Sequence, residues 1–163
     1  MTEISGLVDR LSQRLMARGW MLATAESCTG GMIASACTDL AGSSAWFDRG
    51  FVTYSNAAKT DALGVPETLL QAHGAVSEAV VRAMAEGACT NSLAQVSMAV
   101  TGIAGPSGGS DQKPVGTVWL GWCINGRTVS RRMHFDGDRG EVRQATVLAA
   151  LQGLQEHWST LSD

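Results

Sequence analysis

The sequence predicts a single α/β domain in which helices cover both faces of a mixed β-sheet, a three-layer α/β/α sandwich. Two observations predict this fold. Helical and strand-like segments alternate from one end of the chain to the other, and Asn125-Gly126 separates two strand-like segments as in a tight antiparallel hairpin. The 163 residues correspond to about one domain, at ~150 residues per domain, and contain no linker or internal repeat. Residues 1–163 are therefore expected to form one domain.

The N-terminal part of the chain predicts a helix, a buried strand and a second helix. Apolar residues recur at helical spacing over residues 4–16, and Gly19 follows as a C-cap. The short apolar run 21–25 is typical of a buried strand. It continues through 26–31 into a run of small and apolar residues at 32–40, which is typical of a helix. The order is therefore strand, tight turn, helix.

The middle of the chain predicts one strand and three helices. Residues 45–54 are rich in aromatic and β-branched side chains, which favour a strand, and 56–63 follow as a short helix. Pro66 suits the first turn of another helix, which Gly74 would close. Ser77 is a candidate N-cap for a third helix, whose stripe of mostly small residues would allow close packing on a sheet.

The C-terminal part of the chain predicts a strand, a hairpin and a long helix. Residues 96–101 form an apolar run typical of a central strand, and the glycine-rich segment 102–110 follows as a loop. The two hairpin strands are expected at 115–124 and 127–135. The last helix is expected at 138–158.

The composition excludes several classes of protein. Hydrophobic residues make up 45% of the chain, which argues against an intrinsically disordered protein. The net charge is −3 and no block of like charge stands out, which argues against nucleic-acid binding. No apolar run approaches the ~20 residues of a membrane span. The N-terminal residues carry charges where a signal peptide has an apolar core. We therefore expect a cytoplasmic protein that binds neither nucleic acid nor a membrane.

The cysteines and histidines do not form a metal-binding pattern. They are Cys28, Cys37, Cys89, Cys123, His73, His134 and His157. No pair of cysteines has C-x-x-C spacing, and no cysteine lies near a histidine at the spacing of zinc ligands. In a reducing compartment cysteines are expected as free thiols. We predict no metal and no cofactor.

The segment 25–31, with the sequence AESCTGG, is the strongest candidate for chemistry. It places the Ser27 hydroxyl where a predicted strand ends and a predicted helix begins. Backbone N–H groups at such a turn are unpaired and carry partial positive charge, so they can hold a phosphate or the oxyanion of an acyl transfer. Gly30 and Gly31 would let a substrate approach the backbone closely. Alternatively, Ser27 or Thr29 only caps the helix.

The segment 53–59, with the sequence TYSNAAK, supplies a candidate base. Tyr54 and Lys59 lie five residues apart across a predicted change from strand to helix. A lysine acts as a base only when it is neutral, a state that burial or nearby positive charge favours. Serine with lysine is a known form of activated nucleophile, so Lys59 could pair with Ser27. Alternatively, Lys59 is a solvated side chain at a helix start, since nothing local brings the two residues together.

Two further segments could bind a ligand. A glycine-rich loop follows the predicted strand 96–101, at the end of a strand where open α/β sheets bind ligands. It lacks the P-loop and dinucleotide-binding patterns and could instead be a flexible surface loop. Arg139 and Arg143, one helical turn apart, could hold a phosphate or carboxylate, or form a solvated face. The substrate-binding candidates are Thr101, Gly102, Ala104, Gly105, Arg139 and Arg143.

Two alternatives to a serine hydrolase stay open. Cys28 could be the nucleophile, because a helix N-terminus can lower the pKa of a thiol. The glycine-rich loops could also belong to a module that binds a nucleotide or phosphate without converting it. A thiol hydrolase would be inactivated by alkylation. A binding module needs a charged Lys59 that faces its ligand, whereas a serine hydrolase needs Lys59 within reach of Ser27.

Six segments, taken in order, carry a resemblance to a known family. They read AESCTGG, TYSNAAK, GVPETL followed by GAVSE, AVTGIAGPSGG, KPVGTVW and GDRGEVR. This pattern resembles the C-terminal domain family of the competence/damage-inducible protein CinA, over about residues 5–155. Stand-alone members of that family are nicotinamide-nucleotide amidohydrolases. Full-length CinA proteins carry a further N-terminal domain, for which we expect no room in this chain.

The resemblance implies a three-layer α/β/α fold and hydrolysis of the carboxamide of nicotinamide mononucleotide, which yields nicotinate mononucleotide and ammonia. It implies that Ser27 is the nucleophile, that Lys59 takes its proton and that Tyr54 relays or orients that proton. The N–H groups expected to hold the oxyanion belong to Cys28, Thr29, Gly30 and Gly31. The resemblance implies no metal or cofactor. The expected partner is a small nucleotide substrate, and a homo-oligomer is compatible with the sequence.

Overall fold

The structure, a computed structural model, describes residues 2–161. Its strands are β1 (Leu22–Glu26), β2 (Phe47–Val52), β3 (Val96–Gly102), β4 (Thr117–Ile124) and β5 (Arg127–His134). Its α-helices are α1 (Glu3–Arg18), α2 (Met32–Thr38), α3 (Asn56–Leu63), α4 (Glu67–His73), α5 (Glu78–Thr90) and α6 (Arg139–Leu161). A short 3-10 helix, η1, spans Ser43–Ala45.

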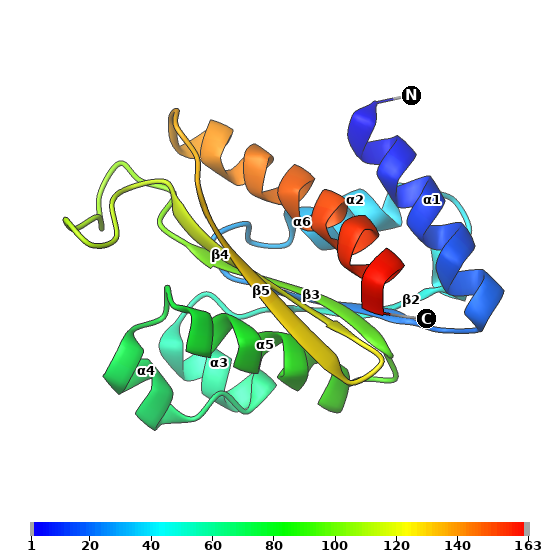
Figure 1. Ribbon diagram of the computed structural model, residues 1–163, viewed down its shortest axis with the longest axis horizontal. Coiled ribbons are helices and arrows are strands. Elements are labelled where there is room, and N and C mark those ends of the chain that lie inside the picture. The colour runs from blue at the N-terminus through cyan, green and yellow to red at the C-terminus, as the bar shows by residue number, and fades with distance from the viewer. Residues whose placement is uncertain (1, 162–163) are drawn as a thin grey trace.

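The elements form three layers, as predicted (Figure 1). The strands pair in the order β2-β1-β3-β4-β5, with β2, β1 and β3 parallel and with β4 and β5 antiparallel to their neighbours. Helices α1, α2 and α6 cover one face of this sheet, and α3, α4 and α5 cover the other. The mixed α/β/α fold is therefore confirmed, including the hairpin between β4 and β5.

The parallel strands end side by side. In the register of the sheet, Glu26 at the end of β1 lies opposite Val52 of β2 and Val100 of β3. The chain leaves β1 at Ser27 and β2 at Thr53, so both residues lie at the same edge of the sheet. Open α/β sheets bind ligands at this carboxyl edge.

Local signals fix the ends of several helices. Gly19 ends α1 in the left-handed region, with φ 66°. At the start of α5, the Ser77 hydroxyl accepts a hydrogen bond from the Val80 N–H at 3.3 Å. Before α6, the Asp138 carboxylate accepts from the Glu141 N–H at 2.9 Å, and the Glu141 carboxylate accepts from the Asp138 N–H at 3.0 Å. This reciprocal pair is a capping box.

Some boundaries differ from the predictions. The strand expected at 45–54 is shorter, because Gly42 (φ 83°) turns the chain into η1 and the pairing with β1 begins only at Phe47. The first hairpin strand begins after Gly116 rather than at 115, because Gly116 (φ 94°) lies where a side chain would meet the Phe135 carbonyl. The last helix extends to Leu161.

Two clusters of buried apolar side chains hold the layers together, one on each face of the sheet. Trp122 of β4 fixes the position of α6 in the first cluster, since its indole N–H donates to the Ala150 carbonyl at 2.9 Å. Gly153 lies against the same ring. A Cβ at this position would be 2.2 Å from a Trp122 ring carbon, so the glycine permits the close approach of α6 to β4.

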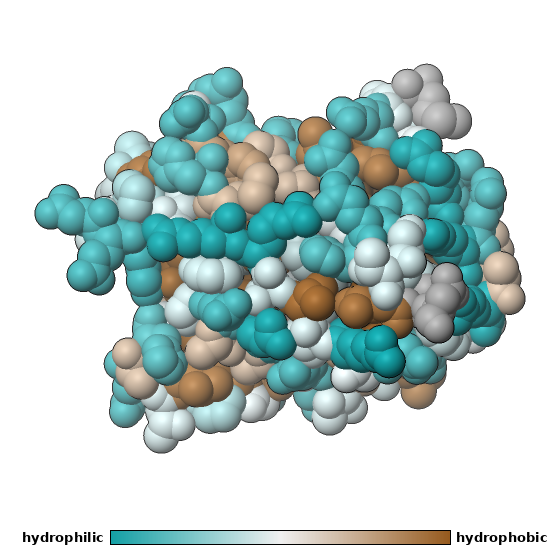
Figure 2. All heavy atoms as spheres, viewed as in Figure 1, coloured by the Kyte–Doolittle hydropathy of each residue, from teal (hydrophilic) through white to brown (hydrophobic). Residues whose placement is uncertain are grey.

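The edge strand β5 carries exposed charged side chains. Hydrophilic side chains make up much of the face on which the edge strand β5 lies (Figure 2). Arg127 and Arg132 of this strand are exposed. Charged side chains on an edge strand discourage pairing with another chain. Within residues 2–161, no helix combines the length and the apolar character that a membrane crossing requires.

Candidate functional site

A cleft of about 330 Å³ lies at the carboxyl edge of the parallel strands. The turn after β1, the segment after β2, the loop after β3 and the segment before α5 line it. The sequence candidates among its lining residues are Ser27, Cys28, Tyr54, Lys59, Thr101, Gly102, Ala104, Gly105 and Arg139. Residues that are distant in sequence thus meet in one cleft because three strands end at the same edge.

The Lys59 amine reaches the Ser27 hydroxyl. The two atoms, Nζ and Oγ, lie 3.0 Å apart, and the Lys59 residue is only 1% exposed. Ser55 starts α3 as its N-cap, accepting from the Ala58 N–H at 3.0 Å, and this start places Lys59 one turn into the helix, facing the sheet edge. The distance is within the range that a nucleophile and its base require.

Two carbonyls complete the surroundings of the Lys59 amine. Nζ donates to the Thr53 carbonyl at 2.9 Å and to the Tyr54 carbonyl at 3.2 Å. Burial lowers the pKa of Lys59 below the ordinary value of a lysine, because a desolvated ammonium loses its hydration. The environment therefore favours the neutral amine more than water does.

Cys28 is a poor candidate for a thiolate nucleophile. Its side chain is 5% exposed, and burial raises the pKa of the thiol to about 11, with the negative charge of Glu26 adding to the effect. A thiolate at neutral pH needs a pKa shifted in the opposite direction. The environment of the turn thus favours the Ser27 hydroxyl over the neighbouring thiol.

The backbone of the turn offers a limited set of free donors. The Ser27 N–H donates to the Val100 carbonyl, and the Gly30 N–H donates to the Ser27 carbonyl, both at 3.1 Å. Within residues 2–161, no carbonyl and no side chain of another residue accepts from the N–H groups of Cys28, Thr29 and Gly31, and the Cys28 N–H bonds its own thiol. The Gly30 N–H, expected as an oxyanion donor, is instead engaged with Ser27. Gly30 and Gly31 take φ values of 58° and 106°, in the left-handed region that favours glycine.

Through its hydroxyl, Tyr54 bonds Arg139 rather than the Lys59 amine. Its ring is largely exposed (60%), and its hydroxyl accepts a hydrogen bond from Arg139 Nη2 at 2.9 Å. Arg139 Nη1 donates to the Gly105 carbonyl at 2.9 Å. Tyr54 contacts Lys59 through its backbone carbonyl, whereas its hydroxyl and Arg139 form a bridge to the loop after β3.

The two arginines that share a helix face have separate contacts. Arg139 lines the cleft, but Arg143 does not. Arg143 Nε donates to the Cys28 carbonyl at 3.0 Å, and its Nη2 donates to the Thr29 carbonyl at 3.3 Å. Arg143 is therefore engaged with the backbone of the serine turn.

Sequence analysis did not select one buried residue of the site, Glu26. Its side chain is fully buried at the end of β1 and accepts three hydrogen bonds from the turn and from α2. A carboxylate directly after an apolar strand and next to a candidate nucleophile was the available signal. The loop residues Ile103, Ser107 and Gly108, and Ala75 and Val76 before α5, also line the cleft.

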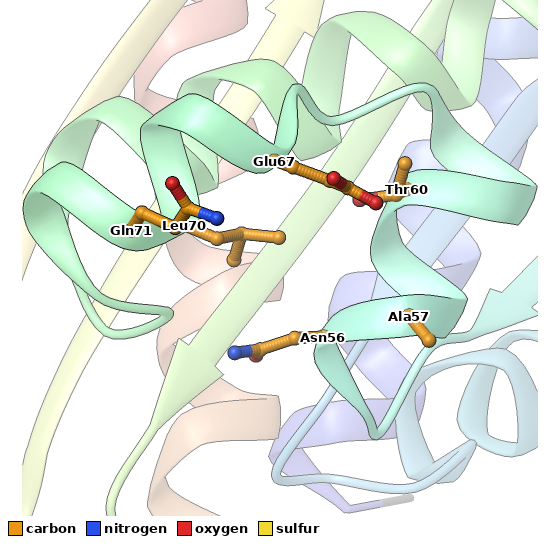
Figure 3. Close-up of a pocket in the computed structure, with 6 residues that line it drawn as sticks. All are labelled: Asn56, Ala57, Thr60, Glu67, Leu70 and Gln71. Atoms are coloured by element: carbon orange, nitrogen blue, oxygen red, sulfur yellow. The ribbon is translucent and has the colours of Figure 1, made fainter.

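A second hollow of about 440 Å³ lies between α3 and α4 (Figure 3). Its lining residues are Asn56, Ala57, Thr60, Glu67, Leu70 and Gln71. Its polar side chains include the Thr60 hydroxyl and the Glu67 carboxylate, but none of the residues selected from the sequence lines it. No cluster of three or more potential metal-ligating His, Cys, Asp or Glu side chains occurs among the residues that the structure describes.

The fold and the cleft define a class: a three-layer α/β domain with a buried serine–lysine pair at the carboxyl edge of its parallel strands. The chain belongs to the CinA C-terminal domain family, whose model matches residues 4–158. It is 56% identical over 154 residues to the nicotinamide-nucleotide amidohydrolase PncC of Pseudomonas putida, covering 94% of this chain and 96% of that protein. It is 51% identical to the protein of that name from Escherichia coli (strain K12), over 96% of both chains.

Solved structures agree with the family assignment. The competence/damage inducible protein CihA from Agrobacterium tumefaciens superposes with a TM-score of 0.92 at 49% identity, covering 96% of each chain. The competence damage-inducible protein A (ComA) from Klebsiella pneumoniae superposes with a TM-score of 0.93 at 42% identity, covering 97% of this chain and 98% of that one. The fold is therefore shared along nearly the whole length.

Proposed function

We propose that the protein is an amidohydrolase that converts nicotinamide mononucleotide to nicotinate mononucleotide and ammonia. The names of the relatives from P. putida and E. coli, nicotinamide-nucleotide amidohydrolases, support the substrate class. The observation that carries the chemistry is the 3.0 Å distance between Ser27 Oγ and the buried Lys59 Nζ. A hydroxyl next to a buried amine is the minimum needed for an activated serine nucleophile.

The first step is removal of the Ser27 proton by Lys59. A neutral amine has two N–H groups and one lone pair. The carbonyls of Thr53 and Tyr54 accept the two N–H groups, which leaves the lone pair for the Ser27 hydroxyl. The two carbonyls thus hold the base in the orientation that proton transfer requires.

The following steps form and break an acyl-enzyme. Ser27 Oγ attacks the carboxamide carbon, and the N–H groups of Cys28, Thr29 and Gly31 stabilise the negative oxygen. The protonated Lys59 returns its proton to the leaving nitrogen, the C–N bond breaks, and ammonia departs. Water, deprotonated by Lys59, then attacks the ester carbon, and Ser27 recovers its proton as the carboxylate leaves.

Arg139 and Tyr54 bind and orient the nucleotide in this proposal. Arg139 lies on the cleft wall with its guanidinium beside the Tyr54 hydroxyl, and an arginine fork suits a phosphate. Arg143 has no such role in this proposal, because it does not line the cleft and two of its N–H groups bond the carbonyls of Cys28 and Thr29. The loop from Thr101 to Gly105 lines the part of the cleft that holds the nicotinamide ring of the substrate.

The test is ammonia release from nicotinamide mononucleotide by purified variants. Ser27→Ala and Lys59→Met should each lose at least ~10³-fold in kcat, since members of a catalytic unit act together. Cys28→Ala, one residue away, is the matched control and should retain most of the activity. Full activity in Ser27→Ala would reject the scheme, and loss confined to Cys28→Ala would move the nucleophile to the thiol.

A binding module that converts nothing gives a different outcome. The wild-type protein would then bind the mononucleotide without releasing ammonia. That interpretation needs a charged Lys59 facing the ligand, whereas burial lowers the pKa of this lysine and its amine points to Ser27. The environment of Lys59 favours the hydrolase.

A further inference from the structure

The Glu26 carboxylate organises the turn that carries Ser27. Its Oε1 accepts from the Thr29 hydroxyl at 2.5 Å and from the Ile33 N–H at 2.9 Å, and its Oε2 accepts from the Ala34 N–H at 3.0 Å. The side chain is fully buried. One carboxylate therefore joins the end of β1, the middle of the turn and the first turn of α2.

This contact replaces an ordinary helix cap. Gly31, the N-cap residue of α2, has no side chain to accept the first N–H groups of the helix. Those groups normally bond to the side chain of the N-cap residue itself. Here the acceptor comes from Glu26, five residues before the cap, so the chain between Glu26 and Gly31 is closed into a loop around its own carboxylate.

Arg143 holds the same turn through the turn's carbonyl groups. Its guanidinium takes the carbonyls of Cys28 and Thr29 at 3.0 and 3.3 Å. In a planar trans peptide the N–H points away from the preceding carbonyl. The Thr29 N–H must therefore point away from Arg143, and the donor directions of the turn are set by this arginine together with Glu26.

We propose that Glu26 is a positioning residue for the reaction, with Arg143 as its counterpart: the two side chains fix the turn so that Ser27 Oγ meets Lys59 and the free N–H groups face the developing oxyanion. This inference rests on the proposed function. Neither side chain touches substrate. A misplacement of about 1 Å at a nucleophile can cost ~10²-fold in rate, so a looser turn should be visible in kcat.

The central variant is Glu26→Gln, which keeps the size of the side chain. Three donors face Glu26, whereas a glutamine amide presents one acceptor oxygen and one NH₂ group, so at least one donor loses its acceptor. We expect kcat for ammonia release to fall about 10- to 100-fold with KM within threefold of wild type. Arg143→Lys, which keeps the charge but lacks the planar fork, should fall by a smaller factor.

The matched controls are Glu156→Gln and Arg131→Lys, which alter an exposed ion pair of 2.9 Å between α6 and β5. Both should keep wild-type kcat. Three measurements distinguish a positioning role of Glu26 from a purely structural one. They are the folded fraction by circular dichroism, the melting temperature, and the pH dependence of kcat. If Glu26 is a positioning residue, kcat of the folded variant falls by the same factor at every pH. The pH at which kcat reaches half of its plateau then stays that of the wild type.

A substrate-independent readout separates this inference from the proposed function. A fluorophosphonate labels activated serines, and intact mass reports the rate at Ser27, with Ser27→Ala as the blank. Glu26→Gln should slow labelling by a factor similar to its loss of kcat, even if the wild-type protein releases no ammonia from the mononucleotide. Wild-type labelling rates in folded Glu26→Gln, a loss of rate that only follows the unfolded fraction, or no labelling of wild-type Ser27 would each overturn the proposal.

Discussion

At the scale of single residues, the site depends on an amine kept out of water. Lys59 has three acceptors within 3.2 Å and almost no exposed surface. Desolvation penalises the ammonium, so the pKa of the lysine falls. A charged Lys59 amine donates one hydrogen bond to each of the three oxygens. A neutral amine donates to the two carbonyls and accepts from the Ser27 hydroxyl. Burial decides which form is accessible at working pH.

The pH dependence of the reaction should follow Lys59. Because its pKa is lowered by burial, the neutral base appears at lower pH than for a free lysine. We expect kcat/KM to be low in acid, to rise as Lys59 loses its proton and to reach a plateau with a midpoint below the ordinary lysine value of 10.5. Ammonia release measured from pH 5 upward, to about 10, checks this limb. A profile without a rising limb contradicts Lys59 as the base.

At the scale of elements, close approaches set the geometry of the layers. Helix α6 lies against β4 at Gly153, where the Trp122 ring fills the space that a side chain would need. The same helix carries Arg139 and Arg143 at its start, so its position on the sheet decides where both guanidinium groups lie. Packing far from the cleft is thus linked to the cleft through a rigid helix.

Replacing Gly153 by alanine should destabilise the protein. The helix gains about 1 kcal/mol from the better helix former, but overpacking against a buried ring costs ~1–3 kcal/mol. A Cβ would lie only 2.2 Å from the Trp122 ring, so the overpacking cost should be at the upper end of that range. We therefore expect the free energy of unfolding to fall by roughly 1 kcal/mol or more. Urea denaturation measures it.

Gly140→Ala in the same helix is the control for that substitution. The nearest atom to its Cβ would be the Asp138 carboxylate oxygen at 3.4 Å, an ordinary contact. Its free energy of unfolding should stay equal or rise slightly. Equal stability changes in the two variants would show that packing against Trp122 does not decide the effect.

At the scale of the whole molecule, the cleft joins distant parts of the chain. Ser27 and Lys59 are 32 residues apart, and Tyr54 and Arg139 are 85 residues apart. A ligand that contacts all of these groups binds only the folded protein, so its binding free energy adds to global stability. This linkage gives a test of substrate binding that is separate from turnover.

The Ser27→Ala variant should bind the mononucleotide without converting it. At a ligand concentration of 100 times Kd, the added stability is ~2.7 kcal/mol, which appears as a rise in melting temperature. Arg139→Gln on the Ser27→Ala background should lose most of this rise at the same concentration, because the phosphate loses its cation. Arg131→Gln on the same background, at an arginine that pairs with Glu156 and does not line the cleft, should keep the rise. An unchanged rise in Arg139→Gln would contradict the phosphate assignment.

The sequence by itself determined the kinds of elements and the position of Ser27 at a turn between strand and helix. These features depend on periodicity, capping residues and turn glycines, which act over a few neighbouring positions. The family resemblance implied that Lys59 serves Ser27, and the tertiary structure decided how the two side chains meet, with Nζ and Oγ 3.0 Å apart. Only the tertiary structure decided that Arg139 and Arg143 take different partners and that Glu26 closes the turn. Those contacts depend on strand register and on how the crossover helices pack against the sheet, and interactions between residues tens of positions apart leave no local pattern.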